Sequence, residues 1–169
     1  MMALPQRALS LAGFVLAHAT WSLSDAESDE RLCPLAVLED DDGDRRMTRF
    51  EADTQEEAIV AGKIAMREAK IHVAAWAFAR EGAWRRMDNT PSGEVLAVDF
   101  WATGMSSVAT LMQPFSRASN GARFRVGTKP TLVIGDAVLA PDVAVPSIAA
   151  IMDGVQAHTI VAELWPTWR

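Results

Sequence analysis

The middle of the chain, residues 71–139, is a series of strand-like runs separated only by short turns. The clearest run is EVLAVDFWAT at 94–103, in which Leu96, Val98 and Phe100 alternate with the residues of the opposite face. Parallel strands need a connection of a dozen or more residues between them, usually a helix, and this region has none. The sequence therefore predicts an α+β fold, with a mainly antiparallel sheet of hairpins and two or three helices packed on one face.

A hairpin and a helix are predicted ahead of this region. Runs at 32–39 and 45–52 flank the turn DDDGD, a pattern typical of a β-hairpin. A helix is expected at about 54–70, with Asp53 or Thr54 as its N-cap and a stripe of alanines and one glycine along one side. Small side chains of this kind let a helix approach a sheet closely.

Two features are expected to interrupt the strands. A turn at Glu81-Gly82 is predicted to separate strands at about 71–80 and 83–88. Pro114 has no N–H to donate to a strand ladder, so its end of the strand is expected at a sheet edge or a bulge.

The first 22 residues are either a helix of the mature fold or a secretion signal. Residues 8–17 have the length of a signal's apolar core, and Ala17-His18-Ala19 fits the small-x-small cleavage rule. Only Arg7 and the amino terminus supply positive charge ahead of that core, which argues against a signal.

A helical stripe favours the retained helix. Small or polar residues recur at steps of three and four over the first 24 positions, and a cleaved signal needs no such order. We therefore expect a helix with Leu11 and Val15 buried, one domain over residues 1–169, and a cytoplasmic protein. Cleavage near Ala19 followed by export is the alternative.

The net charge of −6 is concentrated in one segment. Residues 25–57 hold 13 acidic residues and four arginines. This density of negative charge repels nucleic acid. No apolar run reaches the roughly 18–20 residues that a membrane helix needs. Neither nucleic acid nor membrane is expected as a partner, whereas a basic protein or a second copy of the chain is.

Two features suit a protein partner. An acidic turn steers a basic partner, and exposed tryptophans are favoured anchors at interfaces. The alternative for Trp165 and Trp168 is that they fold back onto the sheet. A short helix is expected at 147–157, and the tail at 159–169 is expected to be irregular. The leading interpretation is a non-enzymatic, inhibitor- or immunity-like binding domain. The candidate partner-binding residues are Asp40, Asp41, Asp42, Asp44, Trp165 and Trp168.

A small enzyme is the alternative interpretation. The sequence has no nucleophile elbow, phosphate-binding loop or metal-ligand spacing, so neither a cofactor nor a metal is expected. The single cysteine, Cys33, excludes an intrachain disulfide. A pocket between the sheet and its helices would gather His18, His72, Arg80 and Asp99. A histidine beside a carboxylate suits general acid–base chemistry.

The DDDGD turn is predicted not to hold calcium. Asp40, Asp42, Asp44 and Glu51 match positions 1, 3, 5 and 12 of a calcium loop, but Arg45 stands at position 6, where glycine makes the sharp turn. Calorimetric titration should detect no binding tighter than about millimolar. A micromolar site that disappears in Asp42→Ala would contradict this prediction.

Overall fold

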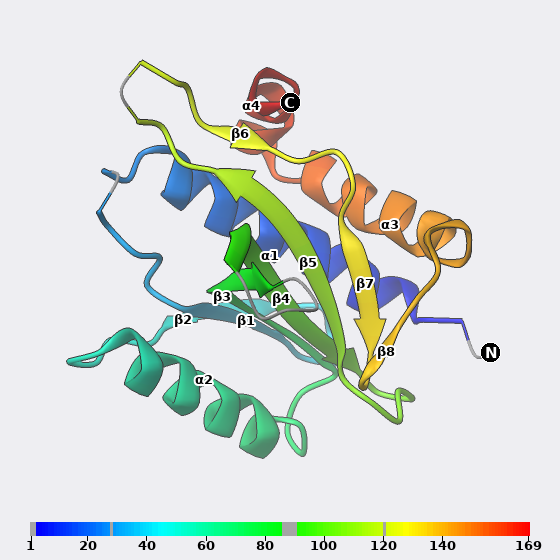
Figure 1. The fold of residues 1–169 in the computed structure, drawn as a ribbon. Helices are drawn as coiled ribbons and strands as arrows, with labels where there is room; N and C mark the ends of the chain where they lie inside the picture. The colour runs from blue at the N-terminus through cyan, green and yellow to red at the C-terminus, as the bar shows by residue number, and fades with distance from the viewer. Residues whose placement is uncertain (1–2, 28, 86–90, 120) are drawn as a thin grey trace.

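The computed structural model shows helices on both sides of one twisted sheet (Figure 1). It describes residues 3–27, 29–85, 91–119 and 121–169. The helices in these ranges are α1 (Gln6–Ser24), α2 (Gln55–Ala69), α3 (Pro141–Gln156) and α4 (Thr159–Trp168). The strands are β1 (Leu35–Glu39), β2 (Arg45–Arg49), β3 (Ala75–Arg85), β4 (Pro91–Ala102), β5 (Ala109–Ser116), β6 (Arg125–Val126), β7 (Thr131–Ile134) and β8 (Ala137–Val138).

The sheet is antiparallel at every pairing between these strands. Its order is β2-β1-β3-β4-β5-β7-β8, and β6 also pairs with β5. Five of the seven pairings between these strands join consecutive strands, as short turns favour, and the other two are β1–β3 and β5–β7. The predicted α+β class with an antiparallel sheet of hairpins is confirmed.

The helices form two layers. α1, α3 and α4 share the main hydrophobic core with one face of the sheet. α2, the helix predicted at 54–70, packs on the opposite face over a second and smaller apolar cluster (Figure 1). The side chain of Thr54 caps α2 by accepting a hydrogen bond from the N–H of Glu57 at 3.1 Å, as its sequence position predicts.

Strand β3 explains the two layers. Ala75, Ala77 and Ala79 point into the main core, where their small side chains leave room for α1. The intervening Trp76 and Phe78 point to the other face and belong to the cluster under α2. The side-chain alternation of one strand therefore determines how closely each helical layer approaches the sheet.

Helix α1 is the central element of the main core. Leu11 and Val15 are fully buried, as the helical stripe predicts. Near the start of α1, Arg7 forms an ion pair with the buried Glu39 at 2.8 Å. Among the described residues, no helix combines the length and hydropathy needed to cross a bilayer.

The turn predicted at Glu81-Gly82 is wrong, because β3 runs through both residues. Gly82 is paired with Val95 of β4, and the strand continues to Arg85. The Glu81 carboxylate accepts hydrogen bonds from the Leu32 N–H and from Arg117, which anchors the strand there. Part of the strand predicted at 83–88 lies outside the described residues.

The C-terminal predictions need two corrections. The helix predicted from residue 147 already begins at Pro141, because proline suits a first helical turn. The tail predicted to be irregular forms α4, although Pro166 lies inside it. A proline near a helix end removes one hydrogen bond, and the burial of Trp165 and Trp168 in the main core outweighs that loss.

Pro114 lies between two partner strands rather than at an edge of the sheet. On the side away from β4, β7 pairs with residues 109–112 of β5, and β6 pairs with 115–116. The buried amide of Gln113 donates hydrogen bonds to the carbonyls of Pro114 and Gly127 at 3.0 and 2.8 Å. These hydrogen bonds hold the chain at the position where the proline has no N–H to donate to a neighbouring strand.

The α1–α3 contact predicts a large effect of adding one methyl group. A Cβ on Gly13 would lie 2.0 Å from the carbonyl oxygen of Ile151, and one on Gly154 would lie 2.5 Å from that of Ser10. Gly13→Ala and Gly154→Ala should each lower the free energy of unfolding by about 2 kcal/mol or more, even though alanine favours helix. Urea unfolding measures this.

Gly82→Ala is the matched control, because its added Cβ would lie 3.6 Å from the nearest atom, a methyl of Val95. A loss of stability in Gly13→Ala no larger than in Gly82→Ala would contradict the proposed tight contact.

Candidate functional site

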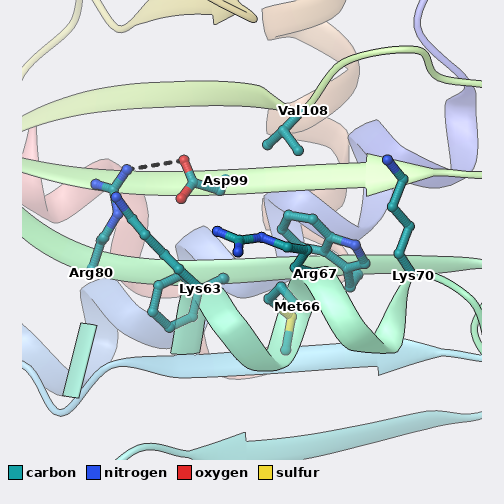
Figure 2. Close-up of a pocket in the computed structure, with 9 residues that line it drawn as sticks. Lys63, Met66, Arg67, Lys70, Arg80, Asp99 and Val108 are labelled. Carbon is teal, nitrogen blue, oxygen red and sulfur yellow. Dashed lines mark hydrogen bonds and ion pairs between the residues drawn. The ribbon is translucent and has the colours of Figure 1, made fainter. Parts of the chain in front are cut away.

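A pocket of about 300 Å³ lies between α2 and the outer face of the sheet. Its residues come from α2, from the neighbouring strands β3 and β4, and from the segment before β5 (Figure 2). Three other hollows of 320 to 400 Å³ hold at most two basic side chains each, whereas four basic side chains line this one. This concentration of charge makes it the candidate site.

The floor of the pocket is apolar. Trp76 and Phe78 of β3 form it together with Met66 of α2, and all three side chains are buried. Gly62 makes the close approach of α2 possible, because a Cβ there would lie 2.3 Å from the Phe78 ring. The glycine in the small-residue stripe therefore brings α2 down over the two aromatic rings.

One wall carries an ion pair between neighbouring strands. Arg80 of β3 donates a hydrogen bond to Asp99 of β4 at 3.1 Å, and the Thr110 hydroxyl of β5 donates to the same carboxylate oxygen at 2.6 Å. Both charged side chains are largely buried, with exposures of 19% and 11%. Asp99 is thus oriented by two donors on adjacent strands, and Arg80 is held at the pocket wall.

A row of basic side chains forms the opposite wall. Lys63 and Arg67 of α2 and Lys70 at its C-cap are spaced at i, i+4 and i+7, so these three exposed side chains lie on one face of the helix. Figure 2 shows them along the pocket, with Arg80 near one end and Lys70 near the other. None of these three takes part in an ion pair with the described residues.

This row is electrostatically unfavourable by itself. Like charges four residues apart on a helix destabilise it by about 0.2–0.5 kcal/mol. The only carboxylate among the described lining residues is Asp99, which is already paired with Arg80. Lys70 gains one partial compensation, because its ammonium lies 5.3 Å from the centre of the Trp101 ring. The pocket therefore has a net positive charge inside an acidic protein.

Two buried N–H groups at the pocket have no hydrogen-bond partner among the described residues. They are Nε1 of Trp76 and Nε of Arg80. Buried donors without partners are uncommon in folded proteins. Both nitrogens are covered by protein atoms, so they add to the cost of burial at this site.

The structure brings together two of the four predicted pocket residues. Arg80 and Asp99 form the ion pair described above. His18 instead lies beside His158, among residues of the main core, with a ring-nitrogen distance of 3.4 Å. His72 is exposed in the turn after α2. The predicted combination of a histidine with a carboxylate is therefore not assembled at this pocket.

The predicted acidic turn is exposed and locally structured. Asp40, Asp41, Asp42 and Asp44 are all exposed at the β1–β2 connection. The Asp40 carboxylate accepts hydrogen bonds from the N–H groups of Asp42 and Asp44 at 2.9 and 3.0 Å, so it supports the turn itself. The next position, Arg45, pairs with the buried Glu39 at 2.8 Å.

The two tryptophans named as candidate anchors are buried, so of the two alternatives the structure shows the one in which they fold back onto the body of the protein. Trp165 is 3% exposed and Trp168 is 7% exposed. Trp168 packs edge-on against Phe124, with ring centres 5.5 Å apart. Because the tail is a helix that folds back onto the main core, neither ring is available on the surface of this conformation.

The sequence placed Lys63, Arg67 and Lys70 on a solvent-exposed helix face, and all three are exposed, but it did not show that they border a pocket. Their regular spacing was visible, but it only shows that they share a face. Whether that face borders a cavity depends on how α2 lies on the sheet.

Comparison with known proteins yields no relative: no family model matches the chain, and no curated protein or solved structure is significantly similar to it.

The Arg80–Asp99 pair should contribute measurably to stability. Asp99→Ala removes the acceptor of two hydrogen bonds and leaves Arg80 without its counter-charge. We expect it to lower the free energy of unfolding by about 2 kcal/mol. Arg80→Met combined with Asp99→Ala should cost less than the sum of the two single changes, by about 1 kcal/mol.

A double-mutant cycle in urea unfolding measures this coupling. Asp142→Ala is the charge-matched control, because it removes a carboxylate that is exposed. Additive losses of stability would show that the ion pair contributes nothing beyond its separate side chains.

Proposed function

We propose that the protein binds a small organic anion with an apolar, ring-containing body in the pocket beneath α2. The observation that carries the proposal is the row of three basic side chains, Lys63, Arg67 and Lys70, facing an apolar floor without acidic partners among the described residues. A negative ligand group would relieve their mutual repulsion, and the aromatic floor would receive the rest of the ligand.

The form of the pocket supports a small ligand. Binding sites for small molecules are concave, mainly apolar, and carry a few polar groups that orient the ligand. Such sites enclose about 300–1,000 Å³, so a cavity of about 300 Å³ stands at the lower end of that range. Trp76 and Phe78 offer ring faces, and the ammonium and guanidinium groups offer hydrogen bonds to a carboxylate, sulfonate or phosphate group.

Binding is better supported than general acid–base catalysis. The described lining residues include no histidine, and Asp99 is engaged by Arg80 and Thr110. Both hydrogen bonds fall on Oδ1, so only Oδ2 would remain for a proton transfer. The carboxylate is better suited to holding Arg80 in place as a recognition group.

The protein-binding role of the acidic turn stays a prediction, as do self-association and a cytoplasmic location. The turn is exposed, which suits a basic partner. However, Arg46 and Arg49 are exposed on the adjoining β2 and offset part of its charge. The pocket therefore has the stronger support.

Three related probes separate the contributions to binding. Naphthalene-2-sulfonate carries both a ring system and a negative charge, naphthalene-2-sulfonamide is its neutral counterpart, and inorganic sulfate has the charge alone. Isothermal titration should give measurable affinity only for the first. Arg67→Gln and Lys63→Gln should each weaken its binding by about fivefold, corresponding to about 1 kcal/mol for one lost ionic contact.

Arg46→Gln is the matched control, because it removes the same charge from an exposed site on β2. Its affinity for the sulfonate should equal that of the wild type. Equal weakening in all three variants would indicate attraction by overall charge, and no binding of the sulfonate at millimolar concentration would overturn the proposal.

A further inference from the structure

A pair of histidines joins α1 to the beginning of α4. His18 lies in the fourth turn of α1, and His158 directly precedes α4. Nδ1 of His18 and Nε2 of His158 are 3.4 Å apart. Phe14 and Trp21 enclose the pair, with ring centres 5.3 and 5.7 Å from that of His158. The two histidines are 140 positions apart in the sequence, so this contact exists only in the folded chain.

His158 is also the N-cap of α4. Its Nδ1 accepts a hydrogen bond from the N–H of Val161 at 3.3 Å. Accepting that bond requires a lone pair on Nδ1, so the neutral ring carries its hydrogen on Nε2 and donates it to Nδ1 of His18. Protonation of Nδ1 would replace the acceptor by a second donor and remove the cap.

The chain of contacts already holds one hydrogen too many. It runs from Arg49 through His18 and His158 to Val161, with Arg49 Nη2 3.4 Å from His18 Nε2. Each of these three contacts is a hydrogen bond only if one hydrogen lies between its two groups, so the three contacts accommodate three hydrogens. The two end groups and two neutral imidazoles supply four, so one contact brings two donors together even at neutral pH. Every added proton creates another such conflict.

The charges around the pair oppose protonation as well. From β2, Arg49 contacts His18, and the Arg45 guanidinium lies 5.1 Å from the centre of the adjacent Phe14 ring. From α4, the positive end of the helix dipole faces His158. No carboxylate among the described residues forms an ion pair with either histidine.

Burial is the main cause that lowers the pKa of both histidines below 6.5. For His18, the charge of Arg49 and then His158 lowers the pKa further. For His158, a backbone hydrogen bond acts in the opposite direction and is the smaller effect. These directions agree with the count of hydrogens in the contact chain.

We propose that His18 and His158 form an acid-sensitive latch, which holds α4 on the body of the protein while both rings are neutral and weakens its docking when they are protonated. The far end of α4 is held by contacts that do not change in this range. Arg123 donates hydrogen bonds to the carbonyls of Thr167 and Arg169. Acid therefore acts at the first turn of α4 and increases the population in which that turn, with the fully buried Val161, is detached from the core.

The sign of the pH dependence follows from linkage. Undocked histidines take up protons near their ordinary pKa of about 6.5, whereas the docked pair takes them up at lower pH. Docking is therefore at full strength above about pH 6.5 and weakens as the pH falls below that value. Each proton taken up on undocking changes the docking equilibrium by up to about tenfold per pH unit.

Hydrogen exchange of the backbone amides, followed by NMR and corrected for the intrinsic effect of pH, tests the latch. In the wild type, protection in α4 relative to α2 should fall by at least about tenfold between about pH 7.5 and about pH 5.5. His158→Asn keeps a side-chain acceptor at the N-cap but does not titrate. That variant leaves only His18 to titrate, so over the same range the ratio should change by no more than the slope of a single proton.

Two further variants complete the experiment. His72→Asn removes an exposed histidine outside the contact chain and should behave as the wild type does. His18→Gln leaves one titrating ring and should reduce the pH slope to that of a single proton, which tests the latch even if His158→Asn unfolds α4. Either of two results would overturn the proposal. One is a protection ratio of α4 to α2 that does not change with pH in the wild type, and the other is the full wild-type pH slope in both His18→Gln and His158→Asn.

Discussion

The alternation of alanines with large aromatic residues along β3 is the constraint on which the rest of the structure depends. Ala77 and its neighbours on one face let α1 lie close to the sheet, and Trp76 and Phe78 on the other face support α2. Because successive side chains of a strand point in opposite directions, one strand sets the spacing of both helical layers. The rings that support α2 also form the floor of the pocket, so fold and candidate site share residues.

The pocket differs from the rest of the molecule in how its charged side chains are paired. The buried Glu39 is paired with Arg7 and Arg45, and Glu81 is paired with Arg117. Burying a charge without a partner is costly, and these ion pairs offset that cost for the two glutamates. Lys63, Arg67 and Lys70 are exposed to solvent and form no ion pair among the described residues, so they remain available to the proposed anionic ligand. The histidine latch extends the same principle to protonation, because its surroundings disfavour any additional positive charge.

Local patterns in the sequence predicted the elements with clear periods and turn residues. The hairpin around DDDGD, the helix at α2 and the strand at β4 are confirmed. The turn at Glu81-Gly82 and the irregular tail are wrong, because pairing with β4 and burial of Trp165 override a local glycine or proline signal. Arg80 and Asp99 were correctly named as pocket candidates, but their direct contact depends on the β3–β4 register.

The sequence by itself determined the antiparallel connectivity, the positions of α1 and α2 along the chain and the acidic, exposed turn, because each depends on neighbouring residues and short connections. Only the tertiary structure decided that α2 covers the opposite face from α1, that its basic row borders a cavity, and that His18 meets His158. The physical reason is the same in each case. A periodic pattern shows which residues share a face, whereas the partner of that face is chosen by packing between segments distant in sequence.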